Sequence, residues 1–146
     1  MTTQELQAKR RKQSLDELEC VKWGPPTYDS YLVTTCHRLR TKPIGEFSIE
    51  DLRIMIGQKI GLFFLVPLAL EAVERDPMAE GDYYPGDLLS NLLAVPDDFW
   101  HIHKDWKSRL DEVVRRLPDN VEIIADEVAQ YRQRSAQQGT PALDDK

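Results

Sequence analysis

Residues Gly57–Asp87 read GQKIGLFFLVPLALEAVERDPMAEGDYYPGD, and this stretch decides the fold of the chain. Its first half, residues 60–73, is apolar on every side apart from Gly61, Pro67 and Glu71. A helix that is apolar all round lies in the core of a protein. The second half turns acidic and aromatic within a few residues, which predicts a loop that carries charges and rings into solvent. The stretch therefore predicts a central helix followed by a candidate binding surface.

The ends of the helices are marked by capping residues and prolines. Ser48 and Asp51 form a capping-box pattern at the start of a helix over 49–56. Pro67 either lies in the first turn of the central helix, which then starts near Val66, or kinks a longer helix that ends near residue 75. Asp87 is a candidate N-cap for the next helix. Ser14 and Glu17 form a second capping-box pattern, which predicts that a helical turn starts there. Further helical patterns cover about 2–19 with this restart at 14, 27–40, 88–94, 97–117 and 121–133.

These patterns predict an all-α fold, because no alternating run of β-branched or aromatic residues competes with them. We expect a single compact domain over residues 1–146, with about six helices around a central apolar helix. Residues 1–13 are expected to be frayed, and residues 137–146 to form a disordered polar tail.

Composition and targeting signals indicate a soluble, cytoplasmic protein. The first 20 residues are mostly polar and lack the apolar segment of a secretory signal. The longest apolar run, residues 62–70, is less than half of a membrane span. Cys20 and Cys36 are too few for a disulfide framework and suit a reducing compartment. We therefore expect no membrane partner.

The charge distribution excludes nucleic acid as a direct partner and favours a basic protein. The chain carries a net charge of −6, whereas phosphate binding needs a concentrated basic surface. Residues 71–98 alone contain eight acidic residues and one base, Arg75, and net −7. If these acids share one face, that face attracts a basic partner. Alternatively, they only keep the surface solvated.

Candidate catalytic groups do not combine into a site. His101, His103 and Asp105 suggest a metal, but on one helix His103 points away from the other two, and a catalytic metal needs three converging ligands. The adjacent Cys36 and His37 diverge on a helix and cannot act as nucleophile and base. No glycine-rich phosphate loop is present. We predict no enzyme activity, no cofactor and no metal.

The segment 80–87, EGDYYPGD, is the best candidate for a binding surface. Two glycines and a proline shape a defined turn, and its acids stand close together. Tyrosine is enriched in binding hot spots because it offers a large, stiff and amphipathic area. Alternatively, Tyr83 or Tyr84 packs on the core, with one ring inward and one outward as a common arrangement, and Asp82 and Asp87 only cap the turn.

Three runs of this sequence resemble a known family. They are LRxxIGQxIGL at 52–62, LVPLALE at 65–71 and PxAEGDYYPGDLL at 77–89. In order and spacing they resemble the contact-dependent growth inhibition (CDI) immunity proteins, over about residues 48–100. The resemblance implies a small bacterial cytoplasmic protein without catalysis, which binds and blocks the C-terminal toxin domain of a secreted cell-surface toxin. Such toxin domains are frequently nucleases with basic active sites.

We therefore expect an immunity protein that neutralises a basic, nuclease-like toxin domain through an acidic surface. The alternative is a helical adaptor or regulatory subunit with no toxin partner. The candidate toxin-binding residues are Glu80, Asp82, Tyr83, Tyr84, Asp87, Asp97, Asp98 and Trp100. The resemblance carries over no contact residues, and the alternative is that the motif residues maintain the shared fold.

Overall fold

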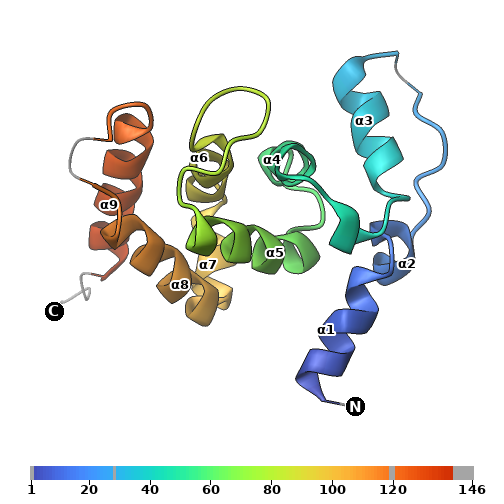
Figure 1. The fold of residues 1–146 in the computed structure, drawn as a ribbon, viewed down its shortest axis with the longest axis horizontal. Helices are drawn as coiled ribbons and strands as arrows, with labels where there is room; N and C mark the ends of the chain where they lie inside the picture. Colours follow the sequence, from blue (N-terminus) through green and yellow to red (C-terminus); the bar gives the residue numbers. More distant parts are fainter. Residues whose placement is uncertain (1, 28, 119–120, 140–146) are drawn as a thin grey trace, which may run out of the picture.

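A computed structural model describes residues 2–27, 29–118 and 121–139, and within them the chain is all-α, as predicted, with no strand (Figure 1). The elements are α1 (Thr3–Arg11), α2 (Leu15–Glu19), α3 (Tyr31–Leu39), the 3₁₀ helix η1 (Ile44–Glu46), α4 (Ile49–Gly57), α5 (Leu62–Arg75), α6 (Asp87–Leu93), α7 (Asp97–Ile102), α8 (Lys104–Arg115) and α9 (Ala125–Gly139). Of the predicted tail, residues 140–146 lie outside the described part.

The capping boxes form as the sequence predicts. Ser48 Oγ accepts a hydrogen bond from the Asp51 amide at 3.1 Å, and Asp51 Oδ2 accepts one from the Ser48 amide at 3.0 Å. Ser14 and Glu17 make the same reciprocal pair at the start of α2. Each box satisfies amides that have no partner within the helix, so these two starts are set by local sequence.

Two predicted helices have different bounds in the structure. The expected helix over 97–117 is broken at His103, whose φ of −110° and ψ of 65° are not helical, and so it becomes α7 and α8. The last helix begins at Ala125, later than the predicted residue 121, and runs to Gly139. Such breaks, together with the separate α1 and α2, raise the helix number of the described residues above the expected six.

Helix α5 lies at the centre, packed against α4, α6 and α8 (Figure 1). It begins after Gly61 and continues through Pro67, so the predicted start near Val66 is wrong. One face is fully buried, through Leu65, Val66, Ala69, Leu70 and Val73. On the other face Phe63 is 47% exposed, so the prediction that every side of this helix is core is wrong at that face.

Helices α4 and α6 approach closely beside α5. At Gly57 an added Cβ would lie 2.8 Å from Asn91 Nδ2, which leaves no room for a side chain there. Asn91 Nδ2 donates to the Arg53 carbonyl oxygen at 2.8 Å and so bonds the two helices. Helix α4 also contacts the loop that precedes α6, because its Glu50 accepts from the Asp82 amide.

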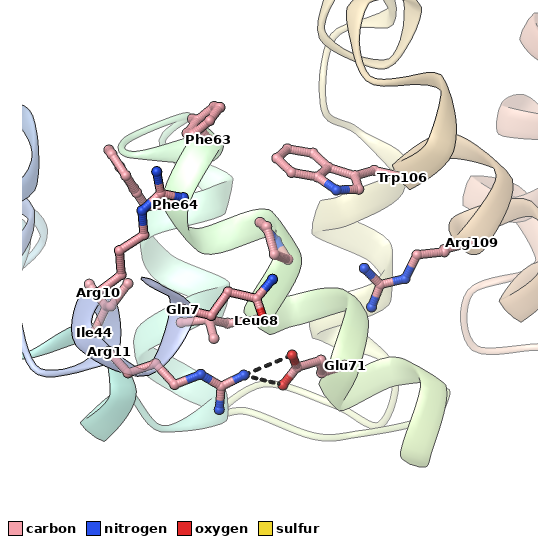
Figure 2. Close-up of a pocket in the computed structure, with 11 residues that line it drawn as sticks. Gln7, Arg10, Arg11, Ile44, Phe63, Phe64, Leu68, Glu71, Trp106 and Arg109 are labelled. Atoms are coloured by element: carbon pink, nitrogen blue, oxygen red, sulfur yellow. Dashed lines mark hydrogen bonds and ion pairs between the residues drawn. The ribbon is translucent and has the colours of Figure 1, made fainter. Parts of the chain in front are cut away.

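The N-terminal helices attach to this core through apolar and polar contacts, and Leu15 of α2 and Leu39 of α3 are fully buried in it. Helix α1 contains no buried residue. It contacts α5 through Arg11, whose guanidinium donates to both carboxylate oxygens of Glu71 at 2.8 Å (Figure 2). Arg40, the residue that follows α3, is buried and bonds Asp16 of α2 at 2.8 Å. None of the described helices is long and apolar enough to cross a membrane.

Candidate functional site

The loop between α5 and α6 is organised around the carboxylate of Asp87. Asp87 is the first residue of α6 and only 1% exposed. Its side chain turns back into the loop, where Oδ1 accepts from the Gly81 amide at 2.7 Å, and Oδ2 accepts from the amides of Tyr83 at 3.1 Å and Tyr84 at 3.4 Å. The prediction that Asp87 is the helix N-cap is wrong: Gly86 holds that position, at φ +87°.

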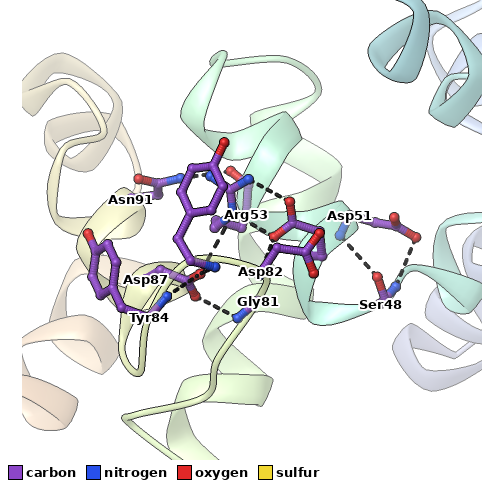
Figure 3. A network of polar contacts seen from close by, with 10 residues as sticks. Ser48, Asp51, Arg53, Gly81, Asp82, Tyr84, Asp87 and Asn91 are labelled. Atoms are coloured by element: carbon purple, nitrogen blue, oxygen red, sulfur yellow. Dashed lines mark hydrogen bonds and ion pairs between the residues drawn. The ribbon is translucent and has the colours of Figure 1, made fainter. Parts of the chain in front are cut away.

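A second carboxylate and an arginine from α4 complete the network (Figure 3). Arg53 bonds Glu50 at 2.6 and 2.5 Å, and its Nε lies 3.8 Å from Asp87 Oδ2. Glu50 Oε1 also accepts from the Asp82 amide at 2.8 Å. Every backbone amide from residue 81 to residue 84 therefore donates to one of two carboxylates, which flank one guanidinium.

The ion pair between Glu50 and Arg53 also shifts the pKa values of these two groups. The hydrogen bonds from Arg53 hold the pKa of Glu50 below its ordinary value, and the bonds to Glu50 raise the pKa of Arg53. Both groups are consequently charged at neutral pH. The loop is thus supported by permanent charges in a region of limited solvent access.

Above this network the two tyrosines point in different directions. Tyr83 is 72% exposed, and its ring lies over the Arg53 guanidinium at 4.1 Å from the centroid. Tyr84 is partly buried and packs against the core. Glu80 and Asp82 are exposed beside them. The loop consequently presents one aromatic ring and two carboxylates to solvent on a bonded backbone.

The other candidate residues are not part of this surface. Asp97 and Asp98 are the first two residues of α7, where Asp97 bonds Arg134 at 3.3 Å and Asp98 is exposed. Trp100 is fully buried, and its indole Nε1 has no hydrogen-bond partner among the described residues. Because Trp100 and Asp87 are buried, neither side chain presents a surface to a partner.

Half of the acids in the segment 71–98 are neutralised by ion pairs. Four of its eight acids pair with arginines from other elements: Glu71 with Arg11, Glu74 with Arg109, Asp87 with Arg53 and Asp97 with Arg134. The bond from Arg109 lowers the pKa of Glu74. In the described part of the chain, the acids of this segment without an ion pair are Asp76, Glu80, Asp82 and Asp98.

Sequence reasoning missed Glu50 and Arg53. Their spacing is that of an ordinary ion pair within one helix, and nothing in that spacing indicates a contact with a loop that begins about 30 residues later. His101 and His103, in contrast, make no contact within the described part of the chain that indicates a binding site. His103 stacks on Trp106 at 4.3 Å between centroids, and His101 is exposed. Across the described residues, no group of three or more His, Cys, Asp or Glu is placed to hold a metal ion.

Comparison with known proteins yields one family. The model of the family described as CDI immunity proteins matches residues 17–110, which include α4, α5 and the whole loop and leave out α1 and α9. No curated protein and no solved structure matches the chain.

Proposed function

Because the chain belongs to the family of CDI immunity proteins, we propose that it binds and neutralises the C-terminal toxin domain of a CDI effector through the outer surface of the 80–84 loop. The observation that carries the proposal is the family match, and the exposed ring of Tyr83 indicates where to look for the contact. The proposed surface consists of Glu80, Asp82, Tyr83 and the exposed part of Tyr84.

The bonded backbone of the loop suits it to binding. A loop that is ordered before binding loses little conformational entropy when a partner docks. All four amides from 81 to 84 are held by Glu50 and Asp87. The ring of Tyr83 is likewise placed over Arg53, which limits its rotamers while leaving most of it exposed. Hot spots are often such stiff, accessible aromatic groups.

The charge of this surface favours a basic partner. Asp76, Glu80 and Asp82 lie within one short loop and have no ion pair among the described residues. We extend the proposal to a toxin domain that is a nuclease with a basic active site, met in the bacterial cytoplasm and blocked by binding rather than by catalysis. Charged pairs across such an interface would accelerate association at low salt.

The test is the affinity for the toxin domain encoded immediately upstream, used as a catalytically inactive variant. Tyr83→Ala is expected to weaken binding by about tenfold or more. The matched control is Tyr31→Ala, because Tyr31 is 74% exposed and begins α3, a helix that Figure 1 shows on the other side of α4 from α6. Asp82→Lys should lower the association rate and reduce its dependence on salt.

Each outcome has a distinct meaning. Failure of the wild-type chain to bind the toxin domain overturns the proposed function. Binding that Tyr83→Ala and Asp82→Lys leave unchanged removes the loop from the interface. A toxin domain that cleaves neither RNA nor DNA overturns the nuclease extension alone.

A further inference from the structure

A cavity of about 140 Å³ lies over α5, between α1 on one side and α8 on the other (Figure 2). We call it the α1–α8 groove. Its apolar walls include Phe63, Phe64 and Leu68 of α5 and Trp106 of α8, and its polar wall includes Arg10 of α1. The groove is separate from the 80–84 loop, none of whose residues line it.

Three guanidinium groups line the groove, and two of them are neutralised. Arg11 binds both oxygens of Glu71, and Arg109 bonds Glu74 at 2.7 and 2.9 Å. Arg10 has no carboxylate partner among the described residues. Its guanidinium carbon lies 5.8 Å from the Phe63 centroid and 5.5 Å from that of Phe64. The groove therefore holds one uncompensated positive charge against aromatic rings.

The rings at the mouth of the groove remain accessible. Phe63 is 47% exposed although it belongs to the central helix. Its ring contacts Trp106 at 5.8 Å between centroids, and Trp106 in turn stacks on His103. Aromatic groups held together at a surface gain free energy when a partner covers them. An apolar side chain could fill this space beside the Arg10 guanidinium.

We infer that the α1–α8 groove binds a single carboxylate side chain of the toxin domain, with an apolar side chain next to it, as a second contact apart from the 80–84 loop. This inference rests on the proposed function. The uncompensated charge is that of one guanidinium, which matches one carboxylate and can bond it in a bidentate manner. A polyanion fits poorly, because Glu71 lines the groove, Glu74 bonds one of its arginines, and the whole chain carries −6.

The two sides of the groove differ in whether they belong to the residues that the family model matches. Phe63, Phe64 and Trp106 lie within the matched residues 17–110, whereas Arg10 lies before them. The uncompensated charge of the groove thus comes from a helix outside the matched region. A contact made by such a helix would contribute to recognition of this chain's own toxin.

The test compares Arg10→Glu with Lys9→Glu in binding to the inactive toxin domain. Both variants change the net charge equally on neighbouring residues of α1, but Lys9 does not line the groove. Arg10→Glu is expected to weaken binding by about tenfold or more, since a hydrogen-bonded charge pair is lost and a repulsion is added. Lys9→Glu should change the affinity by less than about threefold.

Two further measurements separate contact from folding. Phe63→Ala should weaken binding more than Ile123→Ala, because Ile123 is similarly exposed, at 50%, but does not line the groove. In a set of single Asp→Lys and Glu→Lys variants of the toxin domain, one should restore binding to Arg10→Glu. Circular dichroism of each variant records whether the helices remain.

The outcomes distinguish the two proposals. No binding by the wild-type chain overturns the proposed function and this inference with it. Wild-type binding with equal affinities for Arg10→Glu and Lys9→Glu overturns the groove contact only. Binding of an RNA or DNA oligonucleotide that Arg10→Glu abolishes and Lys9→Glu preserves shows a nucleic-acid occupant, and it also overturns the contact with a toxin carboxylate.

Discussion

The loop between α5 and α6 is held by more buried contacts than helix α1, although its backbone is less regular. The loop has no regular structure, yet Asp87 and Glu50 bind every amide from 81 to 84 and Arg53 lies between the two carboxylates. Helix α1 is regular but buries no residue. Order at a protein surface therefore follows from buried partners, and regular backbone geometry alone does not provide it.

This difference bears on how each region can bind. The loop is held in one shape, so a partner must fit the shape that it finds. Helix α1 contacts α5 through an exposed ion pair and the stacking of Arg10 on Phe63 and Phe64. Helix α1 also packs on η1. We nevertheless expect the α1 side of the α1–α8 groove to adjust to a partner more readily than the loop does.

The largest expected effect comes from Asp87→Ala. This change removes the acceptor for three loop amides and a charge that faces Arg53, all in a buried position. Breaking a buried ion pair by removing one partner costs about 3–5 kcal/mol of unfolding free energy. Urea denaturation measures it, and Asp82→Ala is the control because that carboxylate is exposed in the same loop. Equal stabilities of the two variants would show that the loop does not depend on Asp87.

A smaller loss is expected from Glu50→Gln, and it should depend on pH. The glutamine cannot supply the charge that Arg53 binds, so the cost is about 1.5–3 kcal/mol at neutral pH. Because the pKa of Glu50 is lowered in the folded chain, its stabilisation is complete above the unfolded glutamate pKa of about 4.3 and is lost as the pH falls through the lower folded value. Denaturation curves at several pH values should therefore converge for the two proteins in acid. A constant difference down to the most acidic conditions would contradict this role.

Gly86→Ala tests the turn that leads into α6. An L-residue in this left-handed conformation costs about 1–2 kcal/mol, and the new Cβ would also lie 3.0 Å from Met78 Cε. Gly24→Ala is the control, since its φ is +71° and nothing lies within 4 Å of an added Cβ. Thermal unfolding should show a larger loss for Gly86→Ala. Equal losses would mean that the contact with Met78 adds nothing.

The sequence predicted what local chemistry determines. The capping boxes at Ser14 and Ser48, the all-α class and the exposed loop follow from residues that are neighbours in the chain. The break at His103 was missed because no proline or glycine marks it. The number of unpaired acids in the segment 71–98 was overestimated because their partners are remote: Arg11 lies 60 residues from Glu71, and Arg134 lies 37 from Asp97. Contacts across such separations leave no signal in local spacing.

The smallest expected effect concerns the attachment of α1. Both side chains of the Arg11–Glu71 pair are substantially exposed, and exposed pairs contribute about 0.2–1 kcal/mol. A double-mutant cycle with Arg11→Ala and Glu71→Ala should give a coupling energy in this range. Global stability should hardly change, while amide hydrogen exchange in α1 rises and exchange in the 80–84 loop stays as in the wild type. If the α1 amides instead remained as protected from exchange as those of the loop, the distinction between a fixed loop and an adjustable groove would fail. The groove would then be as rigid as the loop.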